Sequence, residues 1–139
     1  MPYPPEYERA GKKFTSFLTD VKKNADFGSS HMAYTMAQGV FQVFRRRLSL
    51  QDAIKFTNIL PAGIRALFVA EWNPEEEVRP FGDRETMIDE VRQLRPDHNF
   101  STDNSISEVA AALRKHVDEQ LLDETLATFP RGAMEFWKV

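Results

Sequence analysis

The 139-residue chain contains no cysteine, only 6 glycines and no long apolar run. The absence of cysteine excludes disulfides, thiolate nucleophiles and cysteine-ligated metal sites, and it is typical of a reducing compartment. No uninterrupted apolar run exceeds Ala66 to Ala70, far short of the ~18 residues of a membrane helix, and the N-terminus has no signal-peptide pattern. We therefore expect a cytoplasmic protein that does not enter the membrane.

Signatures of catalysis and nucleotide binding are absent as well. The chain has no Gly-x-Gly-x-x-Gly, Walker or Gly-x-Ser-x-Gly motif. His31, His98 and His116 are too far apart for a helical zinc pair, and none follows a Glu by three positions, as a di-iron bundle requires. We interpret all three as surface or loop histidines and predict no catalytic residue, metal site or cofactor. Whether the protein is an enzyme stays open, with the evidence favouring a non-enzyme.

Apolar residues recur at helical spacing along most of the chain, which predicts an all-α fold of about eight short helices. Ser49 and Asp118 stand where N-caps are expected, and Pro61 suits a first helical turn. We expect the helix from Pro61 to extend toward Trp72, and Gly39 to permit a close helix crossing. The side chains expected to face inward on the third, seventh and eighth helices are Leu50, Ala53, Ile54 and Thr57; Leu121, Leu122 and Leu126; and Ala133, Met134 and Trp137.

The helices are predicted to fall into two similar units. Leu60-Pro61-Ala62-Gly63 aligns with Phe129-Pro130-Arg131-Gly132 at an offset of 69 (130 minus 61), and the same offset places Ser49 on Asp118. An offset of 70 (91 minus 21) places Val21 on Val91. We interpret this as a duplication in which two units of about four helices pack into one bundle, since each unit alone would have a marginal core.

The predicted organisation has four segments. Residues 1–12 form an extended N-terminal arm, because Pro2, Pro4 and Pro5 oppose a helix. Residues 13–73 form the first helical repeat, 74–82 a polar connector, and 83–139 the second helical repeat, all within one compact domain.

The chain resembles a bacterial family, the domain-of-unknown-function family 2267, from about Phe14 onward. The residues that carry the resemblance are Arg47-Leu48, Leu60-Pro61, Ile64-Arg65, Glu71-Trp72-Asn73-Pro74, and Phe129-Pro130 through Phe136-Trp137. Phe129 and Phe136 replace leucines of the usual family pattern. The resemblance implies a duplicated helical domain from a bacterium, and it implies no catalytic residues because the family has no established activity.

Charge is distributed unevenly between the halves. Residues 1–72 contain 10 Lys and Arg against 6 Asp and Glu, and residues 73–139 contain 8 against 15. The resulting charges of +4 and −7 favour contact between the halves or head-to-tail association, although drift of surface charge explains them equally well.

The leading functional hypothesis is a helical interaction or scaffold module that binds a protein partner or a second copy of itself. Its candidate patch comprises Glu71, Trp72 and Asn73 together with Arg45, Arg46 and Arg47. Against this, Trp72 is interpreted first as a core cap, and the arginines as a solvated helix end.

Two alternatives remain open. One is a small-molecule binder or enzyme with a pocket between the repeats, marked by a buried and satisfied polar cluster. The other, a nucleic-acid-linked regulator, is disfavoured because the helix from Pro61 to Trp72 offers only Arg65 as a basic residue.

Overall fold

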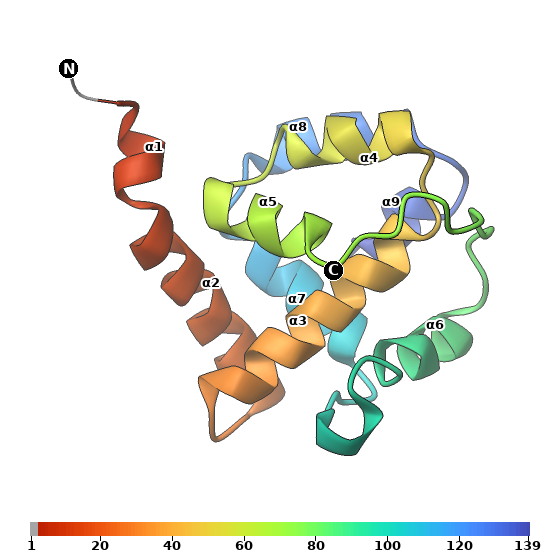
Figure 1. The fold of residues 1–139 in the computed structure, drawn as a ribbon, viewed down its shortest axis with the longest axis horizontal. Helices are drawn as coiled ribbons and strands as arrows, with labels where there is room; N and C mark the ends of the chain where they lie inside the picture. Colours follow the sequence, from red (N-terminus) through yellow and green to blue (C-terminus); the bar gives the residue numbers. More distant parts are fainter. Residues whose placement is uncertain (1–2) are drawn as a thin grey trace.

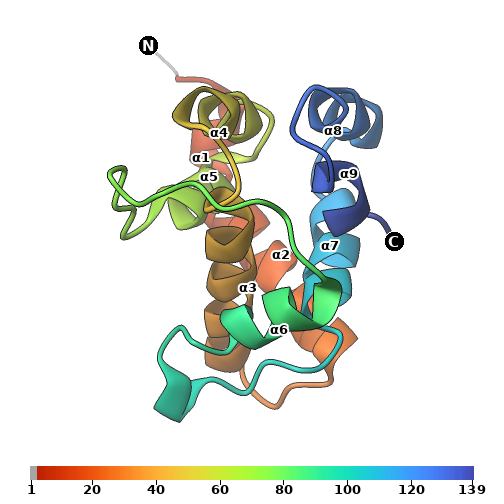
Figure 2. The ribbon, with the colours of Figure 1, turned by 90° about the vertical axis from the view of Figure 1, so that its right-hand side faces the viewer.

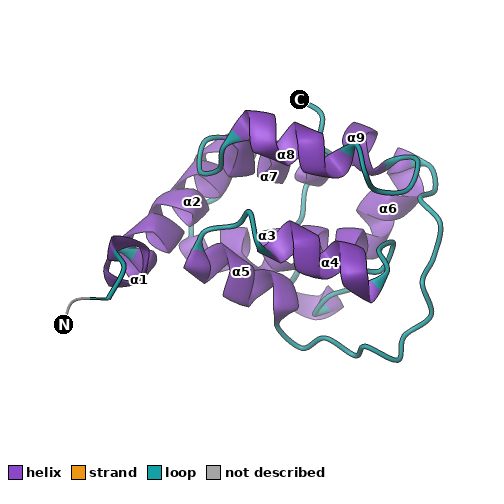
Figure 3. Cartoon of the chain, turned by 90° about the horizontal axis from the view of Figure 1, so that it is seen from above, coloured by secondary structure: helices purple, strands orange, loops and turns teal. Residues whose placement is uncertain are grey.

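A computed structural model describes residues 3–139, which form helices joined by loops without any strand (Figures 1 and 3). The predicted all-α fold is confirmed, and α2 to α9 correspond to the eight expected helices. The elements are α1 (Pro5–Glu8), α2 (Ala10–Ala25), α3 (Ser30–Arg45), α4 (Leu50–Thr57), α5 (Ala62–Val69), α6 (Arg84–Val91), the 3-10 turn η1 (Pro96–His98), α7 (Ser105–Arg114), α8 (Glu119–Leu126) and α9 (Ala133–Phe136).

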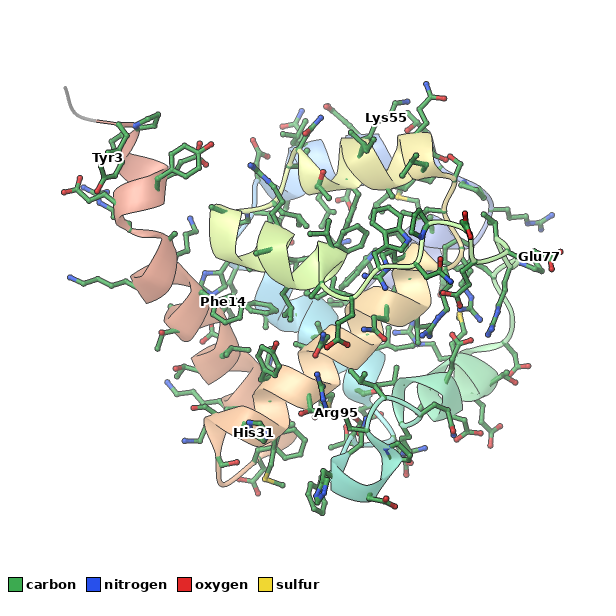
Figure 4. All side chains as sticks on the ribbon, viewed as in Figure 1. Tyr3, Phe14, His31, Lys55, Glu77 and Arg95 are labelled. Carbon is green, nitrogen blue, oxygen red and sulfur yellow. The ribbon has the colours of Figure 1, made fainter. Side chains whose placement is uncertain are left out.

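The prediction of an extended arm over residues 1–12 is wrong for the part that the structure describes. Pro5 begins α1, where its missing N–H removes no helical hydrogen bond and its fixed φ suits the first turn. α2 then begins at Ala10, before the predicted start. Tyr3 is 61% exposed and lies just before the start of α1, away from the rest of the bundle (Figure 4). Met1 and Pro2 lie outside the described residues.

The predicted helix caps are confirmed. The Ser49 hydroxyl accepts a hydrogen bond from the Asp52 N–H at 3.1 Å. The Asp118 carboxylate accepts one from the Leu121 N–H, also at 3.1 Å. Each cap satisfies a backbone donor that the first helical turn leaves without a partner, so the start of these helices is fixed locally.

The helices form a layered bundle. α3 and α7 run through its middle, α2 packs against both, and α6 crosses α3 (Figures 1 and 2). α4 and α8 lie side by side across one end (Figures 2 and 3). Gly39 on α3 permits the close crossing with α6, because a Cβ there would lie 2.8 Å from the Val91 carbonyl oxygen.

Both halves of the chain share one core. Phe44 on α3 is fully buried, with its ring centroid 4.9 Å from Phe56, 5.0 Å from Phe136 and 5.3 Å from Trp137. Trp137 is also fully buried, as its predicted core role requires. Because aromatic pairs add about 0.5–1.5 kcal/mol each beyond area burial, this cluster ties the end of the chain to α3 and α4.

Four predicted inward residues are exposed instead, namely Leu50, Ile54, Leu121 and Met134. On α4 the apolar residues cover two faces of the helix, and the face bearing Ala53, Phe56 and Thr57 takes the core position. Phe56 has the largest apolar side chain on α4, so its burial against Phe44 gains more free energy than burial of Leu50 or Ile54 and turns this face inward. Periodicity could not distinguish these faces.

Helix positions agree with the predicted repeat, which stays a prediction. α4 and α8 are offset by 69 at both ends (119 minus 50 and 126 minus 57). α5 ends at Val69, earlier than expected, and Glu71 follows with a left-handed backbone (φ 57°).

Candidate functional site

Arg45, a member of the predicted patch, lies inside the protein at 3% exposure. Its Nη1 donates hydrogen bonds to the carbonyl oxygens of Phe68 at 2.8 Å and Ala70 at 3.0 Å. These carbonyls belong to the last turn of α5, where acceptors lack helical partners. Arg45 therefore caps α5 and explains why the helix ends before Trp72.

Trp72 is half-buried over the same guanidinium. The Arg45 Cζ lies 5.2 Å from the Trp72 ring centroid, a cation–π arrangement, and Phe68 meets the ring edge-on at 6.3 Å. Burial, followed by repulsion from Arg46, lowers the pKa of Arg45 to about 10. Trp72 thus covers a desolvated cation, in agreement with its interpretation as a core cap.

The interpretation of the arginine run as a solvated helix end is wrong for Arg45 and Arg47, which are both buried. Arg47 Nη1 donates to the Val43 carbonyl at 2.8 Å and to the Glu90 carboxylate at 2.5 Å. Arg46 is half-exposed and pairs with Glu76 at 3.0 Å. The connector and α6 fold back over the end of α3, which the sequence alone does not reveal.

The remaining patch residues face outward. Glu71 and Asn73 are exposed, and the Glu71 carboxylate lies 3.7 Å from an Arg95 guanidinium nitrogen. The structure therefore divides the predicted patch into exposed residues, Glu71 and Asn73, and residues that are partly or fully buried. Arg46 and Trp72 are partly buried, and Arg45 and Arg47 are buried. Whether the exposed residues bind a partner stays a prediction.

A cleft of about 690 Å³ opens at a different place, between segments from both halves. We call it the first cleft. Its walls are α1 with the start of α2, the α4–α5 turn, and the α7–α8 junction. The lining residues are Pro5, Glu6, Arg9, Ala10, Lys13, Asn58, Ile59, Leu60, Pro61, Ala62, Arg65, Lys115, His116, Val117, Asp118 and Leu121. This is the location that a pocket between the repeats requires.

Cationic side chains outnumber acids around the first cleft. Arg9, Lys13 and Lys115 are exposed and form no ion pair or side-chain hydrogen bond within residues 3–139. The lining contains two acids, Glu6 and Asp118, and the Asp118 carboxylate already accepts a hydrogen bond as the cap of α8. Several cations converging on a partly enclosed space create a positive potential there, which attracts anions.

Backbone groups add to this potential. α5 begins at the cleft wall with Pro61 as its N-cap, and no side chain accepts a hydrogen bond from its first turn. The free N–H groups and the positive end of the helix dipole are suited to an anion. Arg65 stabilises the same wall by donating to the carbonyls of Thr57 at 2.9 Å and Leu60 at 3.0 Å.

His116 lies at the inner edge of the first cleft. Its Nε2 is 2.7 Å from the Asp20 carboxylate on α2, and its ring meets Phe17 edge-on at 6.1 Å. The His116 side chain is only 11% exposed, but the residue lies in the loop between α7 and α8, as the interpretation as a surface or loop histidine allows. His31 and His98 are exposed. The pair of His116 and Asp20 is part-buried, and each side chain has a polar partner in the other.

Sequence reasoning missed Arg9, Lys13 and Lys115 because they belong to no motif and Lys115 lies about 100 residues from the other two. Only the fold brings them together. Within residues 3–139, the structure places no group of three or more His, Asp or Glu side chains that could hold a metal ion. In the same range, no helix combines the length and apolar character needed to cross a membrane.

Fold and cleft together define an all-helical bundle with a single core and a cationic cleft where its halves meet. The model of a family described as uncharacterized conserved protein (DUF2267) matches residues 14–136, and the chain belongs to this family. The resemblance read from the sequence is thereby confirmed. No curated protein matches the chain.

Proposed function

We propose that this protein, acting in the bacterial cytoplasm, binds a small anionic molecule in the first cleft. The observation that carries the proposal is the convergence of Arg9, Lys13 and Lys115 on a space beside the uncapped start of α5. None of the three forms an ion pair with an acid in the described part of the chain, residues 3–139. The volume of about 690 Å³ suits a small ligand. Phosphate and carboxylate groups are the anions that such donors recognise.

The apolar part of the wall indicates what else the ligand carries. Ile59, Val117 and Leu121 line the cleft together with the cations, so a ligand with an apolar portion beside its anionic group would fill both kinds of wall. Duplex nucleic acid fits less well, because the side chain of Arg65 is already bonded to backbone carbonyls of its own turn.

A protein-interaction role is the second proposal. Leu50 and Ile54 on α4 are both more than half exposed, and α4 lies beside α8 on one end of the molecule (Figure 3). Exposed apolar side chains on adjacent helices support association with a partner or a second copy. Native mass spectrometry of wild type and of the Leu50→Glu/Ile54→Glu variant tests this proposal, because loss of a complex only in the variant is the expected result.

The anion-binding proposal is tested by titrating ¹⁵N-labelled protein with sodium pyrophosphate and, separately, with citrate. Saturable shifts are expected for the amides of Ala62 and Gly63. The Arg9→Glu/Lys13→Glu variant should weaken binding at least about tenfold, whereas the charge-matched control Lys12→Glu/Lys23→Glu should change it less than about twofold. Equal losses in both variants, or no saturable binding of either anion, would overturn the proposal.

A further inference from the structure

The molecule has a second cleft of about 620 Å³ on the opposite flank, between the connector, the α8–α9 turn and the end of α3. We call it the second cleft. Its lining residues are Arg47, Val78, Arg79, Pro80, Phe81, Gly82, Pro130, Arg131 and Gly132. Figure 2 shows the connector, which carries five of them, crossing from α5 to α6.

The second cleft is built from positions equivalent to those of the first. Six of its nine lining residues differ by 69 from residues that line the first cleft. The equivalent pairs are Arg9 with Val78, Ala10 with Arg79, Lys13 with Gly82, Pro61 with Pro130, Ala62 with Arg131, and His116 with Arg47. Two unrelated surface hollows would not be expected to share so many positions.

The polar pairs beside the two clefts are equivalent as well. His116 pairs with Asp20 at the first cleft, and Arg47 pairs with Glu90 at the second. The basic members differ by 69 in number (116 minus 47) and the acidic members by 70 (90 minus 20), the two offsets found in the sequence. At each cleft, therefore, a basic side chain after a central helix meets an acid on the flanking helix of the other half.

The walls are held in the same way. Arg45 donates to the carbonyl of Phe68, and 69 residues later Arg114 donates to the carbonyl of Trp137 at 2.8 Å. A Cβ on Gly63 would lie 2.9 Å from the Phe14 Cβ, and one on Gly132 would lie 2.6 Å from the Phe81 Cβ. A close glycine–phenylalanine contact thus lies in the wall of the second cleft and directly beside the first, whose lining includes the neighbouring residues Lys13 and Ala62.

Both clefts are cationic, although most of their charges stand at different positions. The second cleft gains Arg79 and Arg131 where the first has Ala10 and Ala62, and no acid is among its lining residues. Glu90 accepts hydrogen bonds from Arg47 and Arg79. Arg131 remains exposed, without an ion pair or side-chain hydrogen bond within residues 3–139, so its guanidinium is available to an anion.

We propose that the second cleft is a second anion-binding site, so that one chain binds two small phosphate- or carboxylate-bearing molecules at equivalent junctions. The proposal rests on the function proposed for the first cleft and extends it to a two-site protein. Arg131 is the principal anion-binding residue of the second site, and Arg9 with Lys13 serves the first.

Isothermal titration calorimetry with sodium pyrophosphate, combined with amide shifts, tests this proposal on the full chain. Wild type should bind two pyrophosphates, with shifts at Ala62 and Gly63 for one site and at Phe81 and Gly132 for the other. Arg131→Glu should weaken only the second site, by at least about tenfold. Arg9→Glu/Lys13→Glu should weaken only the first, and Lys23→Glu should leave both unchanged. Citrate in a parallel titration distinguishes carboxylate from phosphate ligands.

The possible failures are distinguishable. If wild type binds one pyrophosphate and only Arg9→Glu/Lys13→Glu abolishes that binding, the second site is overturned and the proposed function stands. No binding at all overturns both proposals. If wild type binds one pyrophosphate and only Arg131→Glu abolishes that binding, the second cleft is supported as an anion site and the assignment of the first is overturned. Because Arg131 is exposed, misfolding of its variant is not expected, and an unchanged amide spectrum without ligand verifies this.

Discussion

The Nε2 atom of His116 lies 2.7 Å from the Oδ2 atom of Asp20, and this contact joins the second half of the chain to the first. The reciprocal contact is the 2.5 Å pair between Arg47 and Glu90, which joins the first half to the second. The two halves are thus fastened by a pair of exchanged polar contacts as well as by a shared core. The two contacts differ in one property, since a guanidinium cannot readily lose its proton and an imidazole can.

This difference predicts unequal costs of removing the two acids. Glu90→Gln leaves the buried Arg47 charge without a counter-charge and should lower the free energy of unfolding by about 2–4 kcal/mol. Asp20→Asn should cost about 1 kcal/mol, because an imidazole can keep a hydrogen bond to an amide without leaving a permanent charge unpaired. Urea denaturation of both variants at pH 7 measures the two values. Equal costs would contradict the role assigned to Arg47.

The glycines opposite phenylalanines should tolerate alanine poorly. Gly132→Ala places a Cβ 2.6 Å from the Phe81 Cβ at a backbone φ of 106°, so both a clash and backbone strain are expected. We expect a loss of about 2–4 kcal/mol, with a smaller loss of about 1–3 kcal/mol for Gly63→Ala.

Gly28→Ala is the matched control for these two variants. A Cβ at Gly28 meets nothing within 4 Å, so its substitution should change stability by less than about 0.5 kcal/mol. Thermal unfolding followed by circular dichroism compares the three proteins. A Gly132→Ala variant as stable as Gly28→Ala would show that the α8–α9 turn relaxes freely.

The stability of the protein should depend on pH through Glu108. Burial raises the pKa of this carboxyl above its ordinary value, partly offset by the hydrogen bond from the Thr102 hydroxyl. A raised folded-state pKa stabilises the protein below the unfolded-state pKa, and this contribution is lost as the pH rises through the folded-state pKa. Glu108→Gln cannot ionise, so its free energy of unfolding should increase relative to that of wild type as the pH rises from about 4 to about 7. A stability difference that stays constant across urea titrations in this range would refute the assignment.

Substitution of Trp72 should lower the stability of the protein. Trp72→Ala removes the ring that covers the Arg45 guanidinium and contacts Phe68, which should cost about 2 kcal/mol. Chemical denaturation measures this loss, and Val69→Ala, on the exposed end of α5, is the control. An unchanged stability combined with loss of a complex in native mass spectrometry would instead identify Trp72 as a partner anchor.

Local features of the fold could be predicted because neighbours in sequence determine them. Ser49 and Asp118 cap helices through hydrogen bonds from residues three positions later. The N-terminal arm failed as a prediction because Pro5 was weighed as a helix breaker, although proline at a first helical position supports a helix.

Burial of charge could not be predicted in the same way. The sequence indicates solvated side chains for Arg45 and Arg47, because arginines are usually exposed. Their hydrogen-bond partners lie 23 and 43 residues away, so no local pattern reveals them. The cations of the first cleft come from three separate segments with no common motif. Their grouping depends on how the helices pack, which periodicity does not encode.

The sequence by itself determined the helical class, most helix starts and the family, and it predicted the two offsets between the halves. These depend on local hydrogen bonding and on side-chain spacing along one chain segment. The tertiary structure alone decided which face of α4 is buried, which arginines lose their water, and which cations meet around the clefts. Those outcomes depend on free energies of contact between distant segments, which exist only once the chain has folded.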